Sequence, residues 1–171
     1  YDVEELPIHG GSLRIYACHT DDIDKGLSTN VTRVLNDEKK AGLTSLDTYE
    51  MFPEKVKKAK YSILKHLINI KQGKKEIVGY GAPAKGNTLL NYCGIRSDFI
   101  SYTVDKNPYK QGKYLPGTHI PVFAPEKIME TKPDYVFILP WNLKDEIIEQ
   151  MSFIRDWGGK FIIPIPEIEV I

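Results

Sequence analysis

The segment at residues 77–95, IVGYGAPAKGNTLLNYCGI, has the spacing in this chain that most strongly suggests chemistry. It fits the pattern G-x-G-x-x-G/A at Gly79, Gly81 and Ala84, between an apolar run and a helical pattern. In this pattern the first glycine permits a tight turn and the second lets the backbone approach an anion. The small third residue lets the helix pack closely on the strand. The sequence therefore predicts a phosphate-binding loop.

Polar residues in the first turn of the expected helix agree with this prediction. Lys85 supplies a cation, Asn87 supplies a neutral donor, and Gly86 lies between them. Unpaired amides at a helix start, together with the helix dipole, favour negative charge. The alternative is that these glycines only make a tight turn from strand to helix.

Asp105 ends the next expected strand, where a dinucleotide-binding protein keeps the acid that holds a pair of ribose hydroxyls. An NAD-binding oxidoreductase domain is therefore one hypothesis. Pro83 argues against it, because proline stiffens the loop and removes one amide donor. Lys85 argues against it too, since a cation suits a terminal phosphate better than a pyrophosphate that the backbone already holds.

The segment DKNPYKQGKYLPGTHIPV, residues 105–122, is basic, aromatic and rich in glycine. Lys106, Tyr109 and Lys110 could close over a phosphorylated ligand. The alternative is a solvated loop in which proline and glycine set the turns.

Trp141 and Asn142 directly follow DYVFIL, the clearest buried strand in the sequence. This position faces the same crevice as the glycine loop, so the two side chains could stack on a ligand and hydrogen-bond to it. The alternative is a helix cap, Asn142, beside an aromatic plug.

His9, Ser12 and Arg14 surround a Gly-Gly turn near the start of the chain. A histidine can exchange protons near neutral pH, and an arginine can hold phosphate or carboxylate, so these residues form a candidate interdomain site. The alternative is an ordinary hairpin turn. Ser12 lies outside a G-x-S-x-G elbow, and we assign no catalytic residue in this chain.

The elements that must position these residues alternate from residue 76 onward. Short β-rich runs and helical patterns follow one another up to residue 166, which predicts an α/β fold: a Rossmann-like, mostly parallel sheet with helices on both faces. This domain is expected to span residues 45–171. It begins with a long helix over residues 45–71, in which Pro53 lies at the start or at a kink. Residues 1–18 form two extended pieces, and the polar residues 19–44 form a linker.

Composition narrows the class of protein. The 171 residues carry 23 basic and 23 acidic side chains, so a nucleic-acid surface is disfavoured. Cys18 and Cys93 lack ligand spacing, which argues against a metal site and favours the cytoplasm. Apolar runs fall short of the roughly 20 residues that cross a bilayer, so we expect no membrane association.

Four blocks occur in order: LPIHGGSLRIYA, GYGAPAKGNTLLNYCGI, DKNPYKQGKYLPGTHIPV and PDYVFILPWNLKDEI. Together they closely resemble the C-terminal domain of SAM-dependent sugar C-methyltransferases, over nearly the whole chain. The resemblance implies a larger enzyme with a zinc-binding domain, a SAM-binding methyltransferase domain and this Rossmann-like domain. It also implies that residues 1–18 are the terminal strands of the missing methyltransferase domain.

The resemblance further implies a nucleotide-diphosphate sugar as ligand, held by the glycine loop with Lys85 and Asn87, and by Lys106, Tyr109 and Lys110. The family's reaction removes a proton next to a sugar ketone and transfers a methyl group from S-adenosylmethionine. The zinc cysteines, the SAM-binding glycine strand and the histidine-containing base segment have no match here. We therefore expect no cofactor in this chain and no methylation by it alone. Surface left bare by the missing methyltransferase domain would favour a homodimer.

Overall fold

A computed structural model describes residues 1–22 and 24–171, except the side chain of His9. The chain divides into two compact units, residues 1–55 and 56–171. The division falls within helix α3 (Phe52–Gln72). This boundary lies eleven residues after the one expected at residue 44, because the first part of the long helix contributes to neither core.

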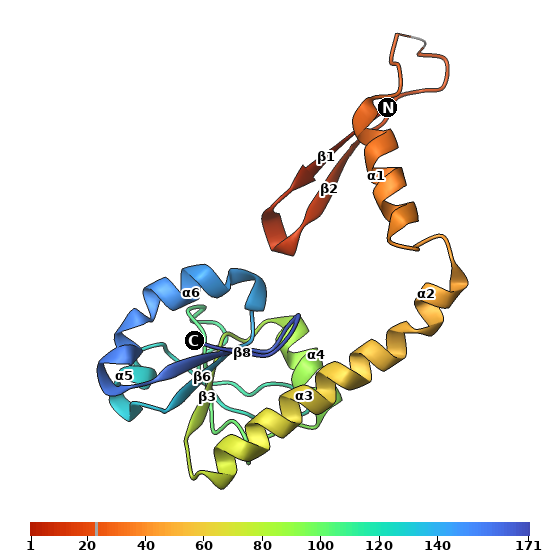
Figure 1. Ribbon diagram of the computed structural model, residues 1–171. Coiled ribbons are helices and arrows are strands. Elements are labelled where there is room, and N and C mark those ends of the chain that lie inside the picture. The colour runs from red at the N-terminus through yellow and green to blue at the C-terminus, as the bar shows by residue number, and fades with distance from the viewer. Residues whose placement is uncertain (23) are drawn as a thin grey trace. The chain divides into compact units, whose positions relative to one another are not determined.

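The second unit contains a six-stranded sheet (Figure 1). Its strands are β3 (Ile77–Tyr80), β4 (Thr103–Val104), β5 (Val122–Phe123), β6 (Tyr135–Ile138), β7 (Lys160–Ile163) and β8 (Glu169–Val170). They lie in the order β5-β4-β3-β6-β7-β8, all parallel except the antiparallel β8. Counted within this unit, the order is 3-2-1-4-5-6, that of a doubly wound dinucleotide-binding sheet. The predicted Rossmann-like fold is confirmed.

Helices cover both faces of this sheet (Figure 1). Helices α3 and α4 (Ala84–Cys93) bury Ile63, Leu67 and Leu90 in one core cluster. On the other face lie α5 (Lys127–Thr131), α6 (Lys144–Gln150) and the 3-10 helix η3 (Ser152–Trp157). The inner strands β3, β4, β6 and β7 are largely buried on both faces, as expected for a parallel sheet, whereas β8 at the edge is exposed.

The long helical pattern forms two helices, α2 (Leu46–Glu50) and α3. Pro53 is the second residue of α3, where a missing backbone donor costs nothing, so it starts this helix rather than kinking it. Apolar residues recur at steps of three or four along residues 46–70, and only the second half of this apolar stripe is buried, at Ile63, Leu67 and Ile70. Leu46, at the beginning of the stripe, is 70% exposed.

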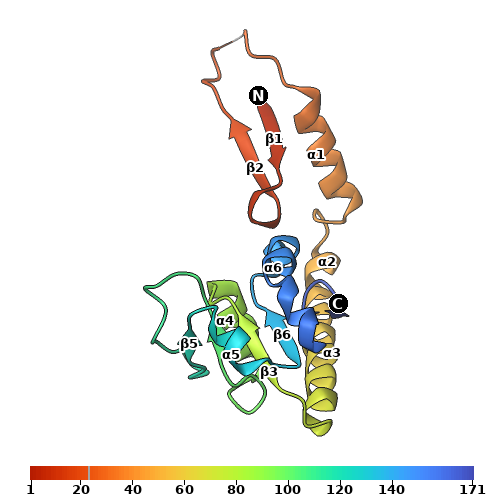
Figure 2. The same cartoon turned by 90° about the vertical axis from the view of Figure 1, so that its left-hand side faces the viewer.

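The first unit pairs β1 (Asp2–Leu6) with β2 (Ser12–Tyr16) in an antiparallel hairpin around the 3-10 turn η1 (Ile8–Gly10). Helix α1 (Thr29–Lys40) packs beside β1 (Figure 2). Val3 is buried, and Arg33 of α1 forms a 2.6 Å ion pair with Glu5. The predicted hairpin is present, and α1 lies inside residues 19–44, for which only a linker was expected.

Three expectations for the last third of the chain were wrong. The pattern over residues 143–157 predicts one helix, but the structure divides this segment into α6 and η3. The run KFIIPIP is expected to be the last strand, but an antiparallel strand, β8, follows it. Asn142 is not a helix cap: Leu143 occupies the N-cap of α6, and Asn142 lies in the 3-10 turn η2 (Trp141–Leu143). Within the described residues, every helix is too short or too polar to cross a membrane.

Candidate functional site

The glycine loop runs from the end of β3 to the start of α4, at the carboxyl edge of the sheet. Gly81 has φ +89°, and a Cβ there would lie 2.6 Å from Cδ of Pro140. The buried Thr103 hydroxyl donates a 2.8 Å hydrogen bond to the Gly81 carbonyl. This position therefore requires glycine both for its backbone angle and for the close approach of Pro140.

Asp105, at the end of β4, is bonded to the glycine loop. Its Oδ2 accepts the Ala82 amide at 2.7 Å and pairs with Nζ of Lys110 at 3.0 Å. The same ammonium donates to the Ala82 carbonyl at 3.0 Å, and Oδ1 accepts the Asn107 amide at 2.8 Å. Asp105 and Lys110 thus form a clasp that holds both backbone polar groups of Ala82.

This clasp changes which amides remain for an anion. The Gly81 amide donates to Val104, the Ala82 amide donates to Asp105, and Pro83 has no amide hydrogen. Helix α4 then begins after Pro83 without a side-chain cap. The first-turn amides of residues 84–86 donate to no group in the described part of the chain. Anion-binding capacity therefore lies at the start of α4 rather than in the loop.

Lys85 lies beside that helix start and contacts the turn after β6. Its Nζ is 4.6 Å from the centre of the Trp141 ring and donates to Oδ1 of Asn142. Burial lowers the pKa of the Lys85 ammonium. Among the described residues no acidic group pairs with it, so an aromatic face and a neutral amide balance its charge.

A pocket of about 260 Å³ opens next to the glycine loop, between the ends of β3 and β4 and helix α6. Its lining is Tyr80, Gly81, Pro83, Asp105, Lys106, Lys110, Pro140, Leu143, Glu146, Ile147 and Gln150. Four predicted site residues are among them: Gly81, Asp105, Lys106 and Lys110. The contribution of α6 to this pocket was not predicted from the sequence, although Leu143, Ile147 and Gln150 are spaced to share one face of a helix.

The charged groups of this pocket are already paired. Lys106 donates to Oε1 of Gln150, whose amide donates to Glu146 at 2.7 Å. Lys110 pairs with Asp105. Tyr80 is only 5% exposed. Its burial raises the pKa of its phenol, and the nearby charges of Asp105 and Glu146 raise this pKa further. The phenol is therefore neutral at physiological pH and can both donate and accept.

The other predicted ligand residues lie around the pocket rather than in it. Gly79 and Gly86 pack against Thr103 and Leu139, where a Cβ would lie within 2.6 and 2.8 Å of a side-chain atom. Ala84 is exposed, and Tyr109 is 81% exposed. The amide oxygen of Asn87 is buried with no partner among the described residues.

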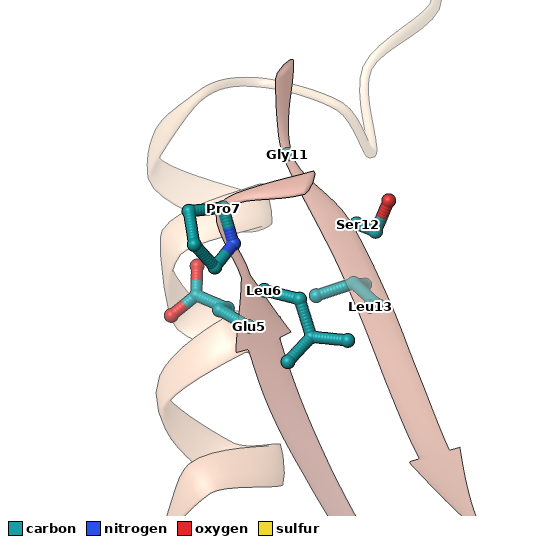
Figure 3. A pocket seen from close by; sticks show the side chains of 6 residues that line it. All are labelled: Glu5, Leu6, Pro7, Gly11, Ser12 and Leu13. Atoms are coloured by element: carbon teal, nitrogen blue, oxygen red, sulfur yellow. The ribbon is translucent and has the colours of Figure 1, made fainter. Parts of the chain in front are cut away.

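The candidate interdomain residues lie in the hairpin. A second pocket, of about 590 Å³, is lined there by Glu5, Leu6, Pro7, Gly11, Ser12 and Leu13 (Figure 3). The Ser12 hydroxyl donates to the Ile8 carbonyl at 3.2 Å, and Arg14 pairs with Glu4 on the opposite strand at 2.9 Å. Arg14 is thus occupied within the hairpin, and the side chain of His9 lies outside the described residues.

The fold is that of a Rossmann-like α/β domain. The start of α4, which has no side-chain cap, and Lys85, which has no acidic partner among the described residues, form a candidate anion site. Residues 7–166 match the model of the C-methyltransferase C-terminal domain, and the chain belongs to that family. It is 35% identical over 170 residues to the C-methyltransferase NovU of Streptomyces niveus, covering 99% of this chain and 40% of that protein. The chain therefore spans less than half the length of this curated relative.

Among solved structures, the chain is similar to UDP-D-quinovosamine 4-dehydrogenase from Vibrio fischeri. The identity is 20%, the TM-score is 0.39, and the match covers 52% of this chain and 75% of that one. A likeness this weak carries no argument about function.

Proposed function

We propose that this chain is the substrate-binding domain of a SAM-dependent C-methyltransferase that acts on nucleotide-linked keto-deoxysugars. The family match over residues 7–166 supports the enzyme class, and the 40% coverage of NovU supports a longer protein. S-adenosylmethionine and zinc would be bound by the other domains of that protein. This chain would supply affinity for the nucleotide-diphosphate sugar and would not methylate by itself.

The observation that carries the proposal is the state of Lys85. Its ammonium, next to the first-turn amides of α4, has no acidic partner among the described residues. A diphosphate placed there would accept hydrogen bonds from the free amides and would compensate the cation. Burial lowers the pKa of Lys85, and the negative charge of a bound diphosphate would raise this pKa again.

The NAD hypothesis receives less support from the same geometry. An NAD pyrophosphate would need the loop amides, but Ala82 donates to Asp105 and Pro83 has none to donate. A ligand that uses the helix start therefore fits better than one that uses the loop.

The test is calorimetric titration of the chain with dTDP, a dTDP-linked sugar and NAD, repeated on Lys85→Ala. We expect both diphosphates to bind and NAD not to. Lys85→Ala should reduce diphosphate affinity about ten- to a hundredfold, since a charge-assisted hydrogen bond contributes about 1.5–3 kcal/mol. Lys65→Ala, an exposed lysine of α3, is the matched control and should leave binding unchanged. NAD binding that is lost on replacing Asp105 would favour the oxidoreductase instead.

A further inference from the structure

The pocket beside the glycine loop differs in charge from the start of α4. Its two lysines are both engaged, Lys110 with Asp105 and Lys106 with Gln150. Glu146 adds a second carboxylate to its wall. The lining therefore carries as many acidic as basic side chains, and a phosphate in it would face Asp105 and Glu146. Such a pocket favours an uncharged ligand that offers both donors and acceptors.

Tyr80 indicates that a polar ligand group belongs in this pocket. Its side chain lies on the wall and is 5% exposed, yet its hydroxyl bonds to no group in the described part of the chain. Tyr102, a second buried tyrosine of the same core cluster, bonds instead to Thr131. Among the described residues, the fully buried side-chain polar atoms without a partner belong to His66, Asn87 and Thr118, so the Tyr80 hydroxyl keeps some exposure and is available to a ligand.

The strand order favours one class of ligand, a nucleoside. In a sheet of this topology, the carboxyl ends of the first two strands, here β3 and β4, lie where a nucleoside sits, with the ribose next to an acid at the end of the second strand. Oδ1 of Asp105 accepts only the Asn107 amide from the described residues, so it can still accept a sugar hydroxyl.

The size of the pocket limits the ligand to one nucleoside. About 260 Å³ lies just below the range of roughly 300–1,000 Å³ that drug-sized ligands occupy. The pocket therefore holds no more than one base with its sugar, and the rest of any longer ligand must lie outside it. Pro83 lines the pocket and directly precedes α4, so a ligand that fills the pocket can continue toward the free amides of that helix.

We propose that this pocket binds the nucleoside end of the ligand, a single uncharged base and sugar, through the Tyr80 hydroxyl and the free lone pairs of Asp105. The inference rests on the proposed function and deepens it, since the diphosphate would extend past Pro83 to the start of α4. It divides the ligand between two subsites: a neutral pocket for the nucleoside and a cationic helix start for the phosphates.

The experiment uses thymidine, uridine and adenosine, which carry no phosphate, in ligand-observed saturation-transfer NMR and titration calorimetry with the chain. We expect at least one nucleoside to bind, and Tyr80→Phe to weaken it about three- to tenfold, the loss of one hydrogen bond. Tyr102→Phe is the matched control and should bind as the unsubstituted chain does. Leu143→Trp, a partly exposed wall position, should block the pocket without disturbing the core.

The outcomes separate this inference from the proposed function. Failure of all three nucleosides to bind, or binding that neither Tyr80→Phe nor Leu143→Trp reduces, would overturn the nucleoside pocket. If dTDP still bound in a Lys85-dependent way, the proposed function would stand without it. Conversely, nucleoside binding that Lys85→Ala leaves intact, with dTDP binding no tighter than thymidine, would support the pocket and contradict the diphosphate role of Lys85.

Discussion

Oδ2 of Asp105 lies 2.7 Å from the amide nitrogen of Ala82 and joins the end of β4 to the loop after β3. Lys110 completes this clasp by bonding to the same carboxylate oxygen and to the Ala82 carbonyl, each at 3.0 Å. The acid that would hold a ribose in a dinucleotide site is therefore also a structural element here. Substitutions of Asp105 should affect folding as well as binding.

Asp105→Ala should lower the free energy of unfolding of the second unit by about 1–3 kcal/mol, because it leaves the Ala82 amide and Lys110 without their acceptor. Urea denaturation followed by circular dichroism would measure the change. Asp98→Ala, at an exposed position, is the control and should change stability by less than about 0.5 kcal/mol. Equal losses from the two substitutions would show that the clasp contributes nothing.

Gly81→Ala should destabilise the chain more than Gly112→Ala. Both glycines have positive φ, +89° and +73°, so each substitution costs about 1–2 kcal/mol of backbone energy. Only at Gly81 would the new Cβ also meet Pro140, at 2.6 Å, whereas the space at Gly112 is open. Thermal denaturation of both variants would compare them, and similar melting temperatures would mean that Pro140 moves away at little cost.

Leu67→Ala should cost about 2–5 kcal/mol, since Leu67 is fully buried between α3 and the sheet. The adjacent Ile68→Ala should cost much less, because Ile68 is 43% exposed on the same helix. Chemical denaturation of the two variants checks which face of α3 packs on the sheet. A larger loss at Ile68 would mean that the helix is rotated relative to the described packing.

A low pH should reduce the free energy of unfolding of the chain, partly through the protonation of Asp134. Its Oδ1 pairs with Lys75 at 2.8 Å and its Oδ2 accepts the Glu76 amide at 2.8 Å, and these bonds, led by the one to Lys75, lower the pKa of Asp134. A pKa lower in the folded than in the unfolded state stabilises the fold above the unfolded value, and this stabilisation is lost as pH falls through the folded value.

The measurement is the free energy of unfolding between about pH 5 and pH 2, for the unsubstituted chain and Asp134→Asn. The variant should lose less stability with falling pH. Asp98→Asn, which removes an exposed carboxylate with no bond to the described residues, serves as the comparison. Parallel curves for the unsubstituted chain and Asp134→Asn would contradict the role of this ion pair.

Much of the fold could be predicted because its signals are local. The apolar run at Ile77–Tyr80, the glycines and the helical pattern after Pro83 lie within a few residues of one another. Their spacing alone predicts a strand, a turn and a helix. The short strands were harder: β4 and β5 have two residues each, and pairing with neighbouring strands, which spacing does not show, defines their ends.

The sequence by itself determined the alternation of strands and helices, the need for glycine at the loop, and the placement of Asp105 and Trp141 after strands. Only the tertiary structure decided which partners these residues have. Lys85 contacts Asn142 across 57 residues, and Lys106 contacts Gln150 across 44. Such contacts depend on the strand order, which places β6 and α6 beside β3. The order results from burying both faces of the whole sheet, a property that no local segment carries.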